Sequence, residues 1–147
     1  MKLFVNLFCR DIAAQLAYYQ ALLGLPEDVH ARSPIYRAIA GEHFQFGFHA
    51  PAAYPVLALD DRRPAPDAPP PVTAYATFML GTPAEVDAAA ARATSLGGRV
   101  LKGPYATYYG QWQAVLADPE GHVFRLSTTG LPAGASAPPL PATLPTT

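Results

Sequence analysis

Two stretches of the chain alternate apolar and polar residues, and a helical pattern follows each of them. The alternating runs are Leu3 to Cys9 and Ala74 to Leu80. Each helical pattern begins after a residue that caps helix N-termini well, Asp11 or Thr82, and stops at a glycine. Pro83 suits the first position of the second helix. The pattern therefore predicts a strand followed by a helix, twice.

Short β-like runs follow each predicted helix. The composition of Asp118-Pro119-Glu120-Gly121 is typical of a turn between the last two runs. Each half therefore has a strand, a helix and about three further strands, which predicts an α+β fold of two tandem βαβββ modules. The runs are 29–32, 35–40, 44–49 and 54–59 in the first half, and 99–102, 112–117 and 122–127 in the second.

Two proline-rich segments lie outside these patterns. Residues 60–73 and residues 129–147 hold five prolines each, and the second segment has no charged residue. Proline fixes φ and donates no backbone hydrogen bond, so neither segment is expected to form regular structure. We expect a single domain over 1–128, with halves 2–59 and 74–128 joined by the linker 60–73. Residues 129–147 form a Pro/Ala/Thr-rich tail that we expect to be disordered.

Composition limits the classes of partner. The chain has 147 residues, ten basic against eleven acidic, and no cluster of lysine and arginine of the kind that binds nucleic acid. Its single cysteine, Cys9, has no partner for a disulfide, which favours a reducing compartment. Neither a signal peptide nor a membrane span is evident in the sequence. We therefore expect a cytoplasmic protein without nucleic-acid or membrane partners.

Four segments have a familiar order and spacing: 4–11 (FVNLFCRD), 18–25 (YYQALLGL), 109–110 (YG) and 117–124 (ADPEGHVF). Together they resemble the vicinal oxygen chelate superfamily, which includes glyoxalase I, extradiol dioxygenases and bleomycin and fosfomycin resistance proteins. This resemblance covers nearly all of the chain before the tail. It implies two half-barrel-like mixed sheets with helices outside, a pocket between their concave faces, and a homodimer.

Metal-using members of this superfamily place one ligand on the opening strand and one on the closing strand of each half. The resemblance puts these positions at Phe4 and Gly47 in the first half and at Tyr75 and Arg125 in the second. Phenylalanine, glycine and arginine side chains do not ligate Zn²⁺, Ni²⁺ or Fe²⁺, and one tyrosine does not make a site. We therefore expect neither a metal nor another cofactor.

An aromatic and polar pocket takes the place of a metal cage. Strand alternation turns one set of side chains inward, and the loop 105–112 would lie over the pocket mouth. Aromatic walls with a few polar groups suit small organic ligands, although the loop aromatics could instead pack as a lid or in a dimer contact. The predicted ligand-binding residues are Phe4, Asn6, Phe8, Gln45, His49, Tyr75, Thr77, Met79, Tyr109, Trp112 and Arg125.

Arg125 carries the most specific hypothesis. A guanidinium group in a partly apolar pocket needs a counter-charge, and the predicted inward faces contain neither Asp nor Glu. Arg125 would bind a carboxylate, phosphate or enolate oxygen of an aromatic or conjugated ligand that stacks on Tyr75 or Phe4. The alternative is a structural arginine that reaches Glu120 or a backbone carbonyl.

The favoured function is metal-independent binding of a small aromatic or conjugated molecule, neutral or anionic, by sequestration. One alternative is a glyoxalase- or dioxygenase-like lyase or isomerase. It would work without metal through Tyr75, His49 or Arg125, or with a non-standard metal site. Another is a regulatory partner module that has kept the fold and lost the chemistry. Catalytic residues are therefore not assigned.

Overall fold

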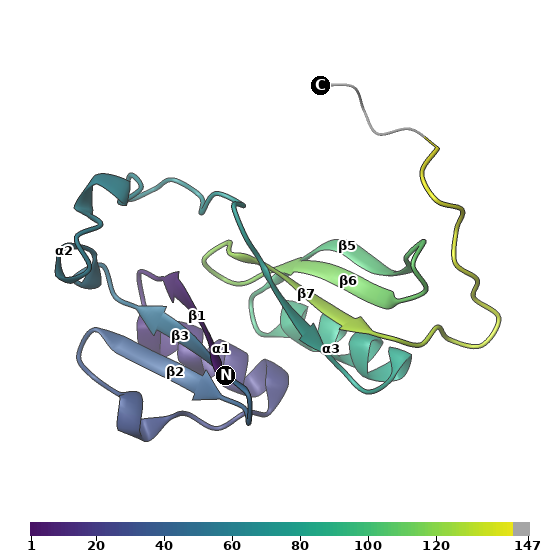
Figure 1. Cartoon of the computed structure of the whole chain (residues 1–147), viewed down its shortest axis with the longest axis horizontal. Helices are drawn as coiled ribbons and strands as arrows, with labels where there is room; N and C mark the ends of the chain where they lie inside the picture. The colour runs from purple at the N-terminus through teal and green to yellow at the C-terminus, as the bar shows by residue number, and fades with distance from the viewer. Residues whose placement is uncertain (143–147) are drawn as a thin grey trace. The chain divides into compact units, whose positions relative to one another are not determined.

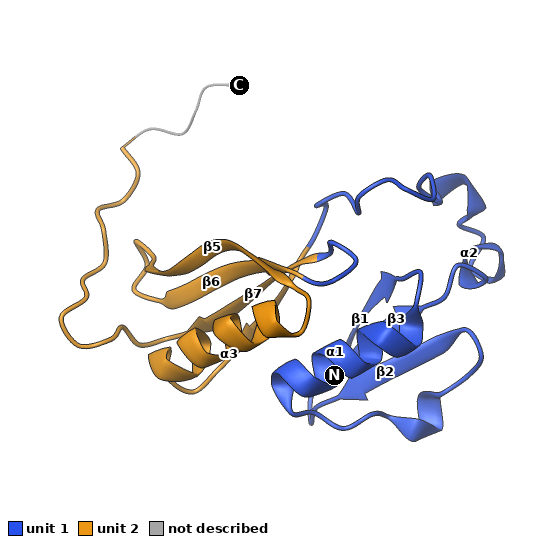
Figure 2. Ribbon diagram, turned by 180° about the vertical axis from the view of Figure 1, so that it is seen from behind, with its two compact units in different colours: residues 1–74, 118–122 blue, residues 75–117, 123–147 orange. Residues whose placement is uncertain are grey.

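The computed structural model describes residues 1–142, and the chain divides into two compact units (Figure 2). Unit 1 comprises residues 1–74 together with the turn 118–122. Unit 2 comprises residues 75–117 and the chain from Val123 onward. Each unit has one mixed sheet with a helix on one face (Figure 1). The predicted α+β class is confirmed.

Unit 1 contains a three-stranded sheet. Its strands are β1 (Leu3–Phe8), β2 (Tyr36–Ala40) and β3 (Phe44–His49), in the order β1-β3-β2. β1 is parallel to β3, and β2 is antiparallel to it. The helix α1 (Ile12–Leu23) connects β1 to the rest of the unit. Its first turn is capped by Asp11, whose carboxylate accepts hydrogen bonds from two backbone N–H groups.

Two predicted strands of the first half are wrong, so the first module lacks its fourth strand. Residues 29–31 form the 3-10 turn η1 (Val29–Ala31), because the side chain of Asp28 accepts a hydrogen bond from the N–H of His30. The run 54–59 begins inside the short helix α2 (Ala53–Val56), and η2 (Asp60–Arg62) follows. Pro55 offers no N–H to a strand partner, yet a first helical turn tolerates proline.

Unit 2 contains the four-stranded sheet expected for a complete module. Its order is β4-β7-β6-β5, with β4 parallel to β7 and the other pairs antiparallel. The strands are β4 (Ala76–Met79), β5 (Arg99–Ala106), β6 (Trp112–Ala117) and β7 (Val123–Thr128). The helix α3 (Pro83–Ser95) begins with a complete capping box between Thr82 and Glu85.

Each helix buries one face of its own sheet. In unit 1 the ring of Tyr19 lies 4.9 Å from that of Phe46 and 5.4 Å from that of Phe48. In unit 2 small residues on α3 bring the helix close to the sheet, where Phe124 and Leu126 are buried. Because strand side chains alternate, the residues between these core positions point to the opposite face of each sheet. That opposite face is called the open face below.

No helix of the described residues is long and apolar enough to cross a membrane. After β7, residues 129–142 form neither helix nor strand. The last residues of the predicted tail, 143–147, lie outside the described part of the chain.

Candidate functional site

In unit 2 the helix α3 lies on one face of the sheet (Figure 2). The opposite, open face carries polar and aromatic side chains. Strand register places Thr77, Arg125, Val115 and Lys102 in one row across all four strands. Residues paired in this way point to the same face. We call this surface the Arg125 face, and its members are Tyr75, Thr77, Met79, Arg99, Lys102, Tyr105, Tyr109, Gln113, Val115, Arg125 and Ser127.

Hydroxyl groups hold the guanidinium group of Arg125. Its Nε–H donates to Oγ1 of Thr77 over 3.0 Å, and its Nη1–H donates to the Tyr109 hydroxyl over 3.2 Å. The guanidinium carbon lies 5.0 Å from the ring centroid of Tyr75, within cation–π range. No ion pair joins Arg125 to a carboxylate within residues 1–142. Its positive charge is therefore oriented but not neutralised.

A buried glutamine fixes the direction of the Tyr109 hydroxyl. The hydroxyl of Tyr109 donates to Oε1 of Gln113 over 2.8 Å, so its oxygen is left to accept from Arg125. The amide nitrogen of Gln113 donates to the hydroxyl of Tyr105. Gln113 is only 3% exposed, which makes this arrangement costly to disturb.

The loop between β5 and β6 is closed by its own hydrogen bonds. Oγ1 of Thr107 accepts from the N–H of Gln111 over 2.9 Å, and Ser127 donates to the side-chain oxygen of Gln111 over 2.8 Å. Gly110 has φ of +80°, a conformation that favours glycine. The loop thereby presents Tyr109 to Arg125.

Among the predicted site residues of unit 2, Trp112 lies on the opposite face of the sheet from Arg125. The indole N–H of Trp112 donates to the carboxylate of Asp87 on α3 over 2.8 Å, so Trp112 lies on the helix-covered face and not beside Arg125. The sequence placed Trp112 both in the loop 105–112 and at the start of the run 112–117, and in the structure β6 begins at this residue. Met79 ends β4, pairs with Ser127 on the open face and is 52% exposed.

The open face of unit 1 is occupied by its own side chains. The Tyr36 hydroxyl donates to Oδ1 of Asn6 over 2.9 Å and passes over Gly47, where a Cβ atom would collide with it. Gln45 is buried, whereas Phe4 is 55% exposed, and the ammonium group of Lys2 lies 5.7 Å from the Phe4 ring.

An aromatic stack fills the other end of this face. The Phe8 ring lies 3.9 Å from that of Tyr54 and 5.4 Å from that of His49, and Tyr36 lies 4.6 Å from His49 on another side. Nδ1 of His49 is buried and has no hydrogen-bond partner among the described residues. Burial lowers the pKa of His49, so its ring is neutral at pH 7.

Sequence reasoning missed Tyr36 and Tyr54 on this face. The alternation of β2 could have indicated that Tyr36 shares a face with Ala38 and Ala40. The crossing to Asn6 depends on the β2–β3–β1 register, which no sequence pattern states. Tyr54 was placed in a strand that does not form.

The residues at the superfamily's metal positions do not fit a metal. Phe4 and Gly47 offer no ligand atom, and the Tyr36 hydroxyl fills the space beside Gly47. In unit 2 the guanidinium of Arg125 lies against the ring of Tyr75, and a cation there repels a second cation. These four positions therefore hold neither a donor set nor the charge that a divalent ion requires.

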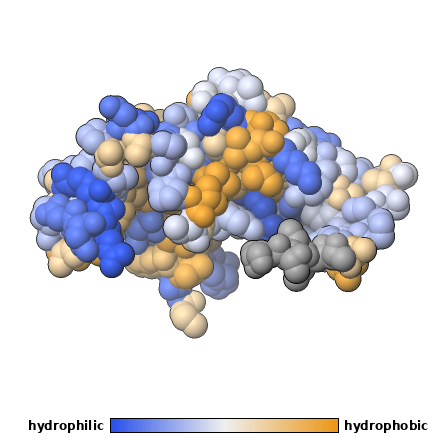
Figure 3. Space-filling view, turned by 90° about the horizontal axis from the view of Figure 1, so that it is seen from above, coloured by the Kyte–Doolittle hydropathy of each residue, from blue (hydrophilic) through white to orange (hydrophobic). Residues whose placement is uncertain are grey.

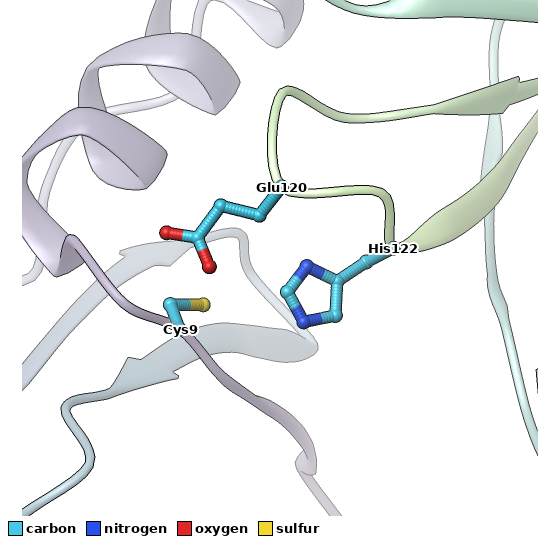
Figure 4. A group of neighbouring side chains, drawn as sticks. All are labelled: Cys9, Glu120 and His122. Carbon is cyan, nitrogen blue, oxygen red and sulfur yellow. The ribbon is translucent and has the colours of Figure 1, made fainter. Parts of the chain in front are cut away.

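A second group of potential ligands lies elsewhere in unit 1, where Cys9, Glu120 and His122 point toward one another (Figure 4). One ligand atom from each residue lies within 4.8 Å of the other two. The carboxylate of Glu120 accepts hydrogen bonds from the backbone N–H groups of Arg10 at 2.7 Å and Asp11 at 2.8 Å. Burial raises the pKa of the Cys9 thiol far above its usual value, and the charges of Glu120 and Asp118 add to the effect.

Both ring nitrogens of His122 are already engaged. Nε2 lies 3.0 Å from the carbonyl oxygen of Phe8, and Nδ1 lies 3.1 Å from Oδ2 of Asp118. Burial alone would lower the pKa of His122, but the hydrogen bond and charge of Asp118, with the Phe8 carbonyl and Glu120, raise it overall. The Glu120 carboxylate and both ring nitrogens of His122 thus already have partners within the protein, and these contacts tie the end of β1 to the turn 118–122.

A family comparison identifies the superfamily. The model of the Glyoxalase/Bleomycin resistance protein/Dioxygenase superfamily matches residues 3–126. The chain belongs to this superfamily. The resemblance found in its sequence motifs is therefore confirmed. No curated protein matches the sequence.

Solved structures resemble this superfamily member over most of its length. A glyoxalase/bleomycin resistance protein/dioxygenase family enzyme from Burkholderia phytofirmans PsJN is 36% identical, with a TM-score of 0.80 over 86% of this chain and 96% of that chain. A glyoxalase-related enzyme from Fulvimarina pelagi is 19% identical, with a TM-score of 0.68 over 87% of each chain. A lactoylglutathione lyase from Agrobacterium tumefaciens is 19% identical, with a TM-score of 0.61 over 87% of this chain and 92% of that chain. The last two show the fold alone.

Proposed function

We propose that this superfamily member binds a small aromatic or conjugated organic molecule, preferentially an anion, directly on the Arg125 face and without a metal. The observation that carries the proposal is the guanidinium of Arg125, held by Thr77 and Tyr109 and without a carboxylate partner in the described chain. A neutral compound could use the same aromatic surface, but it would leave the charge unmatched.

The remaining donors of Arg125 suit a carboxylate or phosphate. A guanidinium has five N–H groups, of which Thr77 and Tyr109 use one each. The others can form a bidentate pair with an anionic group while the ligand ring contacts Tyr75. The structural alternative through Glu120 finds no support, because that carboxylate is bound to the backbone of Arg10 and Asp11.

Benzoate and benzamide test this proposal, because they share a ring and differ in charge. Wild-type protein should bind benzoate more tightly than benzamide in calorimetric titrations. Arg125→Leu should weaken benzoate binding by about 10-fold or more, since a charge-assisted hydrogen bond contributes about 1.5–3 kcal/mol. Arg125→Lys should retain part of the affinity because it keeps the charge and loses the planar fork.

A matched control separates this site from general charge effects. Arg62→Leu removes an exposed arginine of η2 in unit 1 and should leave both affinities unchanged. If Arg125→Leu binds benzoate as tightly as the wild type, the proposal is wrong. Loss of affinity in both variants would indicate non-specific charge attraction and would also contradict it.

The catalytic alternative rests on proton transfer by Tyr75, His49 or Arg125. Tyr75 is exposed beside Arg125, and His49 is held in the aromatic stack with Nδ1 buried. Neither arrangement pairs an acid with a base within hydrogen-bond distance. Simple binding therefore accounts for the site with fewer assumptions, and product formation from a bound compound would establish turnover.

A cytoplasmic location and a homodimer remain predictions. Large apolar side chains are exposed in both units, among them Leu3, Phe4, Tyr75 and Met79. Figure 3 shows apolar patches among hydrophilic surface on one face of the molecule. Analytical ultracentrifugation would measure the oligomeric state directly.

A further inference from the structure

The Arg125 face carries a second cation that the sequence analysis did not single out. Lys102 of β5 pairs with Val115 of β6, and Val115 pairs with Arg125 of β7. The two cations therefore share one row and one face, two strands apart. The ammonium nitrogen of Lys102 lies 3.7 Å from the ring centroid of Tyr105, which keeps it over the sheet.

One chain of hydrogen-bonded side chains connects the two cations. Arg125 donates to Tyr109, Tyr109 donates to Gln113, and Gln113 donates to Tyr105, on whose ring Lys102 lies. Each of these three hydrogen bonds is donated in the direction from Arg125 toward Tyr105. The sheet register, together with this chain of side chains, sets the spacing of the two charges.

The surroundings contain nothing that neutralises these charges. None of the four strands of unit 2 contains Asp or Glu. Neither Lys102 nor Arg125 forms an ion pair within residues 1–142. Asp87, which contacts the sheet through Trp112, reaches its helix-covered face. The open face therefore has a positive potential, to which Arg99, paired with Ala117 at the start of β5, also contributes.

We propose that the Arg125 face selects a molecule with two anionic groups at opposite ends of a flat conjugated frame. Arg125 pairs with one group and Lys102 with the other, while Val115 contacts the frame between them. Neighbouring strands are about 4.8 Å apart, so the two Cα atoms are roughly 10 Å apart. The inference rests on the proposed function and adds the ligand's second charge.

Terephthalate and benzoate test the inference, because they share one ring and differ by one carboxylate. Wild-type protein should bind terephthalate several-fold more tightly than benzoate. Lys102→Met should remove most of this advantage, about 5- to 10-fold in terephthalate affinity, and leave benzoate binding unchanged. Lys102→Arg should preserve the advantage. Lys2→Met, a control in unit 1, should change neither affinity.

The outcomes separate this inference from the proposed function. If Lys102→Met binds terephthalate like the wild type, the second contact is absent. Lys102 then serves only to discourage pairing at the edge strand β5. In that case a benzoate loss in Arg125→Leu would still uphold the proposed function. If Arg125→Leu leaves both affinities intact, the proposed function itself is wrong. Far-ultraviolet circular dichroism would confirm that each variant is folded.

Discussion

At the scale of single residues, Gly47 stands at a position to which the resemblance assigns a metal ligand. In this protein the residue leaves room for the Tyr36 side chain. The Tyr36 side chain crosses this residue to reach Asn6, and a Cβ atom at position 47 would lie 2.5 Å from Cζ of Tyr36. That separation is far below a normal contact. The glycine is therefore required by the tyrosine and not by backbone conformation.

Gly47→Ala should destabilise the protein by about 1–3 kcal/mol, because the added methyl group forces Tyr36 and Asn6 apart. Urea denaturation would measure the free energy of unfolding. The same Gly47→Ala change should destabilise the protein less when it is made in a Tyr36→Leu background, because the shorter side chain no longer crosses residue 47. The comparison is between Tyr36→Leu and the double variant. Equal stability of Gly47→Ala and the wild type would contradict this account of the unit 1 face.

Sequence alternation predicted part of the candidate site. The alternation of side chains along a strand predicted that Arg125 and Thr77 point to the face opposite the helix. The two residues pair across β7 and β4 and form a hydrogen bond. Lys102 was missed because its place opposite Arg125 depends on pairing across β6 and on the register shifts that flank it in β5. Such non-local register leaves no periodic signal in the chain.

At the scale of elements, the turn 118–122 is held to the rest of unit 1 by several hydrogen bonds. The carboxylate of Asp118 accepts from the backbone N–H groups of Glu120 and His122 and from the hydroxyl of Tyr19 on α1. Burial raises the pKa of Asp118. The hydrogen bonds and the charge of His122, together with a hydrogen bond from Gln15, outweigh burial and lower the pKa overall. The carboxylate of Asp118 is thus charged at neutral pH, and its charge favours the protonated form of His122.

This pair gives stability a defined pH dependence. The pKa of His122 lies above its ordinary 6.5, so the stability it contributes is complete below about pH 6.5 and is lost as pH rises through the folded-state value. His122→Gln should therefore cost most near pH 6 and progressively less at higher pH. Asp118 does not titrate in this range because its pKa is lowered, and neither does Cys9, whose pKa is strongly raised.

Free energies of unfolding measured from pH 5.5 to pH 9 would check this dependence. His43→Gln is a suitable control, because the side chain of His43 is exposed and lies beside the exposed carboxylate of Glu42. A difference between the wild type and His122→Gln that stays constant or grows with pH would contradict the assigned protonation state.

Element boundaries show where sequence patterns succeed and where they fail. Caps and glycine stops predicted both long helices, because these signals are local. The runs 29–32 and 54–59 were predicted as strands but form a 3-10 turn and helical turns. Asp28 accepts the backbone N–H of His30, and Pro55 has no N–H to donate to a neighbouring strand. The fourth strand of the first module was wrong for this reason.

At the scale of the whole molecule, the two tandem modules differ in how their open faces are used. Aromatic side chains and a tyrosine–asparagine hydrogen bond fill the face of unit 1. The face of unit 2 presents Arg125 without a counter-charge. The order of motifs predicted the superfamily, but it could not show this division, because duplicated modules have similar patterns whatever their open faces hold.

The central claim is that Arg125 binds an anionic group directly, with no divalent ion between them. Calorimetric titration of benzoate into protein stripped with EDTA and dialysed, compared with the same protein after addition of one equivalent of Zn²⁺ or Ni²⁺, tests it most directly. Equal dissociation constants are the predicted result. Binding that disappears on chelation and returns with the metal would contradict the account.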